Sequence, residues 1–427
     1  MSLKSLITGS IFFIGLVIGQ ELSLNDCVNI ALENKETLGS ARLDLQSAQA
    51  GKRGALSNIL PSINFTGGRS ETNYANNNLF TDNTSWSAGV SGTQTIYDGG
   101  GWWNRIAQAN NNFLIAEQLE RQIRTNVIVE VHRAYFQVLK LEQLVEVAKQ
   151  NLELSEQQVE LAQKRFDLGA AKKTDLLKSE VARGTAQAAL IAQKSNLGIA
   201  RNDLRNAMGL INEDVDLMLR ENLTPIDPVQ NLNDAIIILE TYNPVILAAQ
   251  MQLKDAELRL KLARALRLPS LNATMSYGAN SAQLDGLTDA LNDDWTLRTN
   301  LNLSFPLFNG FALSTQTQQA KLAILKQEND VATITNDVIA QVDNLIVTVN
   351  DFFKIIPINE EVLASAEEDL KLVSERYRLG SASILELLDA QVSVTRARVE
   401  LVSSKYDAQI QEALLKAQLG ILDKQYE

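Results

Sequence analysis

Two near-copies of one motif constrain the fold of this 427-residue chain more than any other feature. The copies, Arg165–Ser179 and Arg376–Ala390, share an Arg, an aromatic residue, a Leu and a Gly, then an acid six residues after the Gly and a Leu two residues after the acid. Both lie between long runs with helical periodicity. Gly169 and Gly380 are therefore expected to end one helix in the left-handed conformation, and the residues after them to turn into the next. Each motif is predicted to be the tip of a helical hairpin.

The internal repeat extends well beyond these motifs. At the same spacing of 211 residues, Gly209 matches Gly420. At a spacing of 208 residues, Leu60–Asn64 matches Leu268–Asn272 in four of five residues. Solenoid repeats have periods of about 20 to 50 residues, so a repeat this long indicates a duplicated half-protein.

Both halves have the same predicted order of helix, strands, long helix and return helix. A 69-residue helix over 100–168 would be about 100 Å long. Helices several times the average length do not fit a compact globular domain, so the pattern predicts an elongated bundle or wall, with a local kink at Pro357. The predicted ranges are helices at 24–58, 100–168 and from the first tip to 209, strands within 61–98 and 269–308, and helices at 232–266, 311–379 and 382–420.

The start of the chain has the pattern of a secretory signal, with Lys4 followed by the apolar run Leu6–Ile18 and a cleavage position before Gln20. A transmembrane anchor is the alternative, although the run is shorter than the roughly 20 residues that a span needs. The expected domains are a signal peptide at 1–19, a first repeat at 20–209, an inter-repeat equatorial segment at 210–231, a second repeat at 232–420 and a tail at 421–427.

The predicted strands alternate between apolar and polar residues. The clearest example is 295–307, whose odd positions are nearly all apolar, and all four Trp residues lie in or beside such segments. This pattern is typical of a membrane β-barrel, with a soluble sheet that has one wet face as the alternative. The smallest membrane barrels have about eight strands, so four strands per chain cannot close one. The barrel must be shared between two chains or three, and the pattern does not choose between them.

Composition narrows the class of protein. Without the signal segment, 38 basic residues oppose 51 acidic ones, a net charge of minus 13, which argues against nucleic acid as a partner. The chain has one Cys and one His, so no disulfide framework or metal cluster is expected. We find no nucleophile elbow, phosphate loop, zinc-protease helix or calcium loop. We therefore expect a protein that is not an enzyme and has no cofactor.

The duplicated order of elements resembles the TolC-like outer-membrane efflux family over nearly all of the mature chain. The residues that carry the resemblance include Leu60–Ser62 and Leu268–Ser270, which enter the strands. Tyr97–Gly100 and Phe308–Gly310 resemble the family's corner between strand and helix. The two tips are similar to its adaptor-docking turns.

This resemblance implies a fold that is mainly α with a membrane β-barrel portion. Three chains would share one barrel of twelve strands in the outer membrane, continued into the periplasm by a trimeric α-barrel of long helices. The protein would be the exit duct of a tripartite efflux pump or a type I secretion system. Its partners would be a periplasmic adaptor, an inner-membrane transporter of RND, ABC or MFS type, and outer-membrane lipid. The alternative function is that of a periplasmic coiled-coil spacer.

The resemblance also implies two sets of site residues, for which ordinary helix stops and a solvated acidic face are the alternatives. Glu386 and Asp389 share one helix face and would narrow the periplasmic mouth, making it cation-selective. Asp175 and Tyr377 would hold the mouth shut through a link between them, with Lys173 or divalent cations assisting. The predicted adaptor-docking residues are Leu168, Gly169, Leu379 and Gly380 at the turns, supported by Arg165, Arg376, Leu177 and Leu388.

Overall fold

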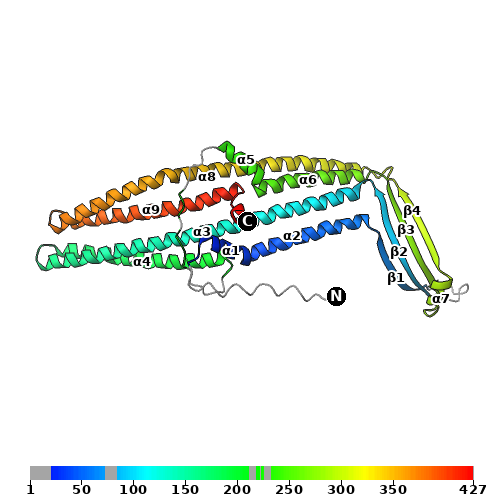
Figure 1. Cartoon of the computed structure of the whole chain (residues 1–427), viewed down its shortest axis with the longest axis horizontal. Helices are drawn as coiled ribbons and strands as arrows, with labels where there is room; N and C mark the ends of the chain where they lie inside the picture. The colour runs from blue at the N-terminus through cyan, green and yellow to red at the C-terminus, as the bar shows by residue number, and fades with distance from the viewer. Residues whose placement is uncertain (1–20, 73–83, 211–217, 222, 226–231, 427) are drawn as a thin grey trace. The chain divides into compact units, whose positions relative to one another are not determined.

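The computed structural model describes residues 21–72, 84–210, 218–221, 223–225 and 232–426 (Figure 1). The predicted signal peptide at 1–19 and most of the predicted inter-repeat segment lie outside these residues. Within the described part of the chain, no helix combines the length and the apolar character needed to cross a membrane.

The fold is mainly α, with four antiparallel strands and a duplicated order of elements, as predicted. The two long helices are α3 and α8, with 67 residues each, and each is followed by a 35-residue return helix. In the first half the elements are α1 Leu24–Asn34, α2 Glu36–Gly54, β1 Ser62–Glu71, β2 Thr84–Asp98, α3 Gly101–Asp167 and α4 Lys173–Ala207. In the second half they are α5 Leu232–Tyr242, α6 Pro244–Ala265, β3 Ser270–Ser281, α7 Gly286–Asp293, β4 Thr296–Ser304, α8 Ala312–Arg378 and α9 Ile384–Gln418.

The first predicted helix of each half is in fact two helices. In the first half the helix is interrupted at Lys35, whose backbone is extended (φ −69°, ψ 118°). The Lys35 ammonium donates to the Glu130 carboxylate at 3.1 Å and to the Asn206 carbonyl at 2.9 Å. In the second half, Asn243 separates α5 from α6, and Pro244 begins α6, where its missing N–H costs nothing. The helix α7 between β3 and β4 was not predicted, and α8 continues through Pro357.

The chain divides into two compact units that each draw on both repeats. The first unit comprises 1–41, 120–244 and 336–427, and the second comprises 42–119 and 245–335, each considered over its described residues. The long helices pass through both units, so the sequence repeat and the packing unit are different divisions of the chain.

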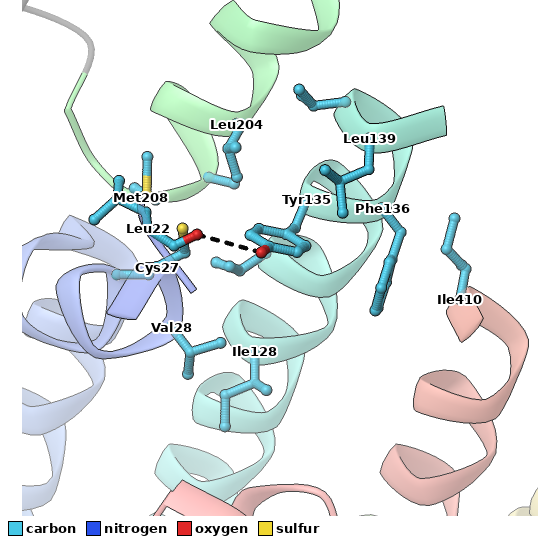
Figure 2. Close-up of a cluster of buried hydrophobic side chains, with 14 of the residues drawn as sticks. Leu22, Cys27, Val28, Ile128, Tyr135, Phe136, Leu139, Leu204, Met208 and Ile410 are labelled. Atoms are coloured by element: carbon cyan, nitrogen blue, oxygen red, sulfur yellow. Dashed lines mark hydrogen bonds between the residues drawn. The ribbon is translucent and has the colours of Figure 1, made fainter. Parts of the chain in front are cut away.

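The core of the first unit surrounds Tyr135 of α3, which is 1% exposed. Figure 2 shows its ring pointing toward Leu22 and Cys27, with Leu204 of α4 nearby. The Tyr135 hydroxyl donates to the backbone carbonyls of Leu22 and Arg220, so burial leaves no polar group without a partner there. Burial raises the pKa of the Cys27 thiol to about 12, and Cys27 therefore packs as an apolar side chain. Each fully buried Leu in such a core contributes about 1.5–3 kcal/mol.

A half-buried arginine, Arg121, joins three separate segments of the first unit. The Arg121 guanidinium of α3 donates to the Tyr242 carbonyl at 2.9 Å, to the Gly420 carbonyl at 2.7 Å and to the Asp423 carboxylate at 2.6 Å. The Asp423 side chain is fully buried. Gly420 has φ 71°, and a Cβ there would lie 2.3 Å from the Tyr242 oxygen, so only glycine fits. Arg121 therefore ties the end of α5 and the C-terminal segment to α3.

His132 makes folding of the first unit dependent on pH. Its Nε2 lies 2.7 Å from the Tyr426 hydroxyl, and burial, with a smaller effect of Lys416, lowers its pKa to about 4. The unfolded chain thus binds more protons than the folded chain between pH 6.5 and 4. The contribution of His132 to the free energy of unfolding is complete above pH 6.5 and falls by about 3 kcal/mol as the pH drops to 4.

Replacing His132 by Gln should remove this part of the pH dependence, because Gln does not titrate. Denaturant titrations at pH 7.5 and 4.5 give the free energy of unfolding of the wild type and of His132→Gln at each pH. The same difference between the two pH values in both proteins would contradict the role of His132.

The second unit contains one sheet of order β1-β2-β3-β4. Its register places Asn64, Ser91, Ser276 and Arg298 in one row across the four strands. Because side chains alternate along strands, this register separates two faces. The face that includes this row is built almost entirely from Ser, Thr, Asn and Gly, and we call it the polar face. The opposite, apolar face has Ile63, Phe65, Trp86, Val90, Ala273, Met275, Tyr277, Leu297, Leu301 and Leu303.

Candidate functional site at the helical tips

The two hairpin tips have the same turn, built on a left-handed glycine. Gly169 has φ 71° and Gly380 has φ 81°. In the first tip the Ala170 N–H donates to the Arg165 carbonyl at 2.8 Å and the Gly169 N–H to the Phe166 carbonyl at 2.9 Å. The second tip repeats both bonds at the equivalent residues. This Schellman pattern satisfies the last carbonyls of each long helix.

Both turns present apolar side chains to solvent. Leu168 is 83% exposed and Leu379 is 77% exposed. A Cβ added at Gly169 would meet nothing within 4 Å, and one added at Gly380 would meet only the Arg165 Nη2 atom, at 3.5 Å. Within the described chain, the turns therefore have free space around them. Leu168 and Leu379 lie on the surface, where exposed apolar side chains can contact a partner protein.

Arg165 connects the two repeats at their tips. Its guanidinium donates to the Tyr377 carbonyl and lies over the Tyr377 ring, 4.7 Å from the centroid. Tyr377 is 4% exposed and packs with Val373, Ile384 and Leu387 in a small core of the second tip. Burial raises the pKa of Tyr377, an effect that the charge of Arg165 partly opposes. The contact between the tips is thus made by Arg165.

The predicted link between Asp175 and Tyr377 is absent within the described chain. The Tyr377 hydroxyl is buried there without a hydrogen-bond partner. The Asp175 carboxylate instead accepts from the Lys172 backbone N–H at 3.3 Å, which caps the start of α4. Lys173, predicted to assist closure, lies over the Phe166 ring, 5.3 Å from its centroid. Within one chain Asp175 serves this local cap because the N–H groups of a helix start need acceptors.

The two predicted mouth acids differ in their surroundings. The Glu386 carboxylate accepts from the Ser383 backbone N–H at 3.0 Å and lies 3.4 Å from the Arg376 guanidinium. The backbone hydrogen bond from Ser383 is the main reason that the pKa of Glu386 is lowered. Asp389 is exposed, and its carboxylate has no ion-pair partner among the described residues. Glu386 therefore has a capping task in addition to any role at a mouth, whereas Asp389 does not.

A groove of about 780 Å³ lies directly behind the tips, between α4 and α9. Leu177 and Leu388 line it, together with Val181, Leu385 and Val392. The structure thus brings these two predicted docking leucines together in one apolar groove.

The floor of the groove contains a residue that sequence reasoning missed. Gln391 is 4% exposed, and its Nε2 atom donates to Asn151 Oδ1 at 2.9 Å and to Ser155 Oγ at 3.0 Å. The signal that could have revealed it is a polar residue at helical spacing between the buried Leu387 and Val394. These bonds fasten α9 to α3 beside the groove.

The sequence profile described as "Outer membrane efflux protein" matches the chain twice, over residues 27–210 and 239–421. These two matches cover most of the chain and fall on its two halves. The chain belongs to the outer membrane efflux protein family and is a TolC-like transport protein of the outer membrane.

Individual relatives are similar over almost their whole length. Outer membrane efflux protein BepC of Brucella suis is 23% identical over 99% of this chain and 93% of BepC. Outer membrane protein TolC of Escherichia coli K12 is 24% identical over 96% of this chain and 86% of TolC. A crystal structure of CusC superposes with a TM-score of 0.84 at 20% identity, covering 93% of this chain and 92% of CusC. The last comparison shows that the fold is shared.

Proposed function

We propose that three copies of this chain form a channel that serves as the outer-membrane exit duct of a tripartite efflux pump or a type I secretion system. The observation that carries the proposal is the sheet of the second unit. Among the described residues it has four strands, with the outer edges of β1 and β4 unpaired, and one apolar face. A free edge in lipid leaves backbone groups without partners, so the sheet needs further copies to close. Three copies give twelve strands, within the range of outer-membrane barrels.

The long helices would continue this channel into the periplasm as an α-barrel. Residues 1–19 would direct export and be removed. The inter-repeat segment 210–231 and the tail 421–427 would form a belt around the helices. The contacts of Arg121 support a place for the tail in this belt, since they hold the described part of the tail against α3 and the end of α5.

The tips would dock a periplasmic adaptor, which in turn would connect the channel to an inner-membrane transporter of RND, ABC or MFS type. The exposed Leu168 and Leu379 and the apolar groove lined by Leu177 and Leu388 support this proposal. An amphipathic helical hairpin is the kind of partner that fills such a groove. Arg165 and Arg376 would support the turns, Arg165 through Tyr377 and Arg376 through the Ser381 carbonyl at 3.2 Å.

Glu386 and Asp389 would form two rings of carboxylates at the periplasmic mouth of the trimer. Like charges that converge repel one another, so a closed mouth would attract cations. The Arg165 contact with Tyr377 would hold the tips together within each chain, and any role of Asp175 at the mouth would lie between chains.

Removing both charges at the mouth should abolish its preference for cations. Glu386→Gln keeps an acceptor for the Ser383 N–H, because Gln serves in the same cap, and Asp389→Asn changes an exposed side chain. The double variant should therefore fold normally and shift the reversal potential in planar bilayers toward that of an unselective pore. Asp44→Asn, an exposed acid on α2, is the matched control. A reversal potential equal to that of the wild type would place the selective element elsewhere.

Cell fractionation separates the channel from the alternative, a periplasmic coiled-coil spacer. The channel should appear in the outer-membrane fraction and migrate differently in gels before and after heating, because a closed barrel resists detergent until it is heated. A spacer should be released with the soluble periplasmic fraction and show no such change. A soluble spacer would also expose the apolar face of the sheet to water, which is unfavourable.

A further inference from the structure

The polar face of the sheet contains two charged side chains among the described strand residues. One is Asp98, the last residue of β2, which accepts from the Trp102 N–H at 3.1 Å and pairs with Arg105. Its charge is therefore neutralised at the start of α3. The other is Arg298 of β4, which is exposed and has no ion-pair partner within the described chain. The remaining side chains of this face are uncharged.

The surroundings of Arg298 leave room for a ligand. Its row contains only Ser276, Ser91 and Asn64 on the other three strands. The next row contains Gly89 opposite Gly278, where the two backbones approach so closely that a Cβ on either would lie 2.8 Å from a carbonyl oxygen of the other strand. A hollow of about 190 Å³ lies over these residues, lined by Arg298.

The surroundings of Arg298 differ from those of Arg69, which occupies the opposite face of the sheet. Arg69 of β1 pairs with Glu71 at 2.8 Å and lies 5.9 Å from the Trp86 ring centroid. Its guanidinium is thus already satisfied by groups of its own face. Arg298 has only hydroxyl, amide and backbone groups in its row, and its positive charge remains available.

We propose that three copies of Arg298 form an anion-binding ring inside the strand section of the channel, a site for small molecules that carry carboxylate, sulfonate or phosphate groups. This inference rests on the proposed function, because the ring exists only if several copies close a barrel with the polar face inside. Guanidinium groups bind such anions through two parallel hydrogen bonds, and rings of Arg select anions in pores. The ring has the opposite sign to the carboxylates proposed at the mouth.

Phosphate block in planar bilayers tests the ring. Inorganic phosphate, added from the side of the strands, should reduce the current through the wild-type channel. Losing the charged donor should raise the half-blocking concentration about tenfold in Arg298→Gln. Arg298→Lys keeps the charge but not the two-pronged geometry and should give an intermediate value. Arg69→Gln is the matched control and should block like the wild type.

The possible failures of this test are distinct. Equal phosphate block in the wild type and Arg298→Gln would overturn the ring while leaving the channel in place. Equal changes in Arg298→Gln and Arg69→Gln would also overturn it, because the effect would then not depend on the polar face. A wild-type protein that conducts no current would contradict the channel itself, and with it the lumen that the ring requires.

Discussion

Export should be abolished when Gly169 and Gly380 are both replaced by Leu, while the trimer still assembles. The new side chains would enter the free space around the turns, where the Cβ positions meet nothing nearer than 3.5 Å, and would block an adaptor hairpin. The left-handed backbone at each glycine costs a non-glycine residue about 1–2 kcal/mol, too little to prevent folding of so large a protein. Survival of a strain that lacks the chromosomal copy, in the presence of an exported compound, measures export.

A second pair of substitutions distinguishes the effect of side-chain size at the turns from the effect of backbone strain. Asn tolerates the left-handed conformation better than Leu and is smaller, so Gly169→Asn with Gly380→Asn should retain most export. Oligomer bands in unheated gels show whether each variant assembles. Normal export by the Leu variant, at normal trimer levels, would show that the turns are only helix stops.

Arg121→Ala should lower the free energy of unfolding of the first unit by about 3–5 kcal/mol. The substitution leaves the buried Asp423 carboxylate without its partner and removes donors from the Tyr242 and Gly420 carbonyls. Denaturant titration followed by circular dichroism measures the loss. Arg220→Ala removes an exposed ion pair with Glu21 and should cost less than about 1 kcal/mol. Equal losses in both variants would show that Arg121 does not join the segments energetically.

The long helices could be predicted from sequence because their signal is local and repeated many times. The predicted helix 100–168 is α3 Gly101–Asp167 in the structure, and the left-handed Gly169 and Gly380 were both foreseen. Helical periodicity over many turns, ended by a glycine, leaves few alternatives. The alternation of apolar and polar residues along β4 is likewise a local and repeated signal, so it also predicts the strand from sequence.

The missed features depend on contacts between segments that are far apart in sequence. The break at Lys35 is accompanied by bonds from its ammonium to Glu130 and to the Asn206 carbonyl, neither of which is a neighbour along the chain. Likewise, the contact of Arg165 with Tyr377 joins the two repeats, so neither copy of the motif reveals it alone. The expected link between Asp175 and Tyr377 stays a prediction for the assembled trimer; within one chain the Asp175 carboxylate accepts from the Lys172 backbone N–H.

The number of chains in the assembled protein tests the central claim most directly. Native mass spectrometry of the complex, extracted from outer membranes in mild detergent, counts the chains without assuming a shape. Three chains, which give twelve strands from four per chain, are the predicted result. A single chain, or a complex of two chains with only eight strands, would contradict the proposed shared barrel of twelve strands and the threefold mouth.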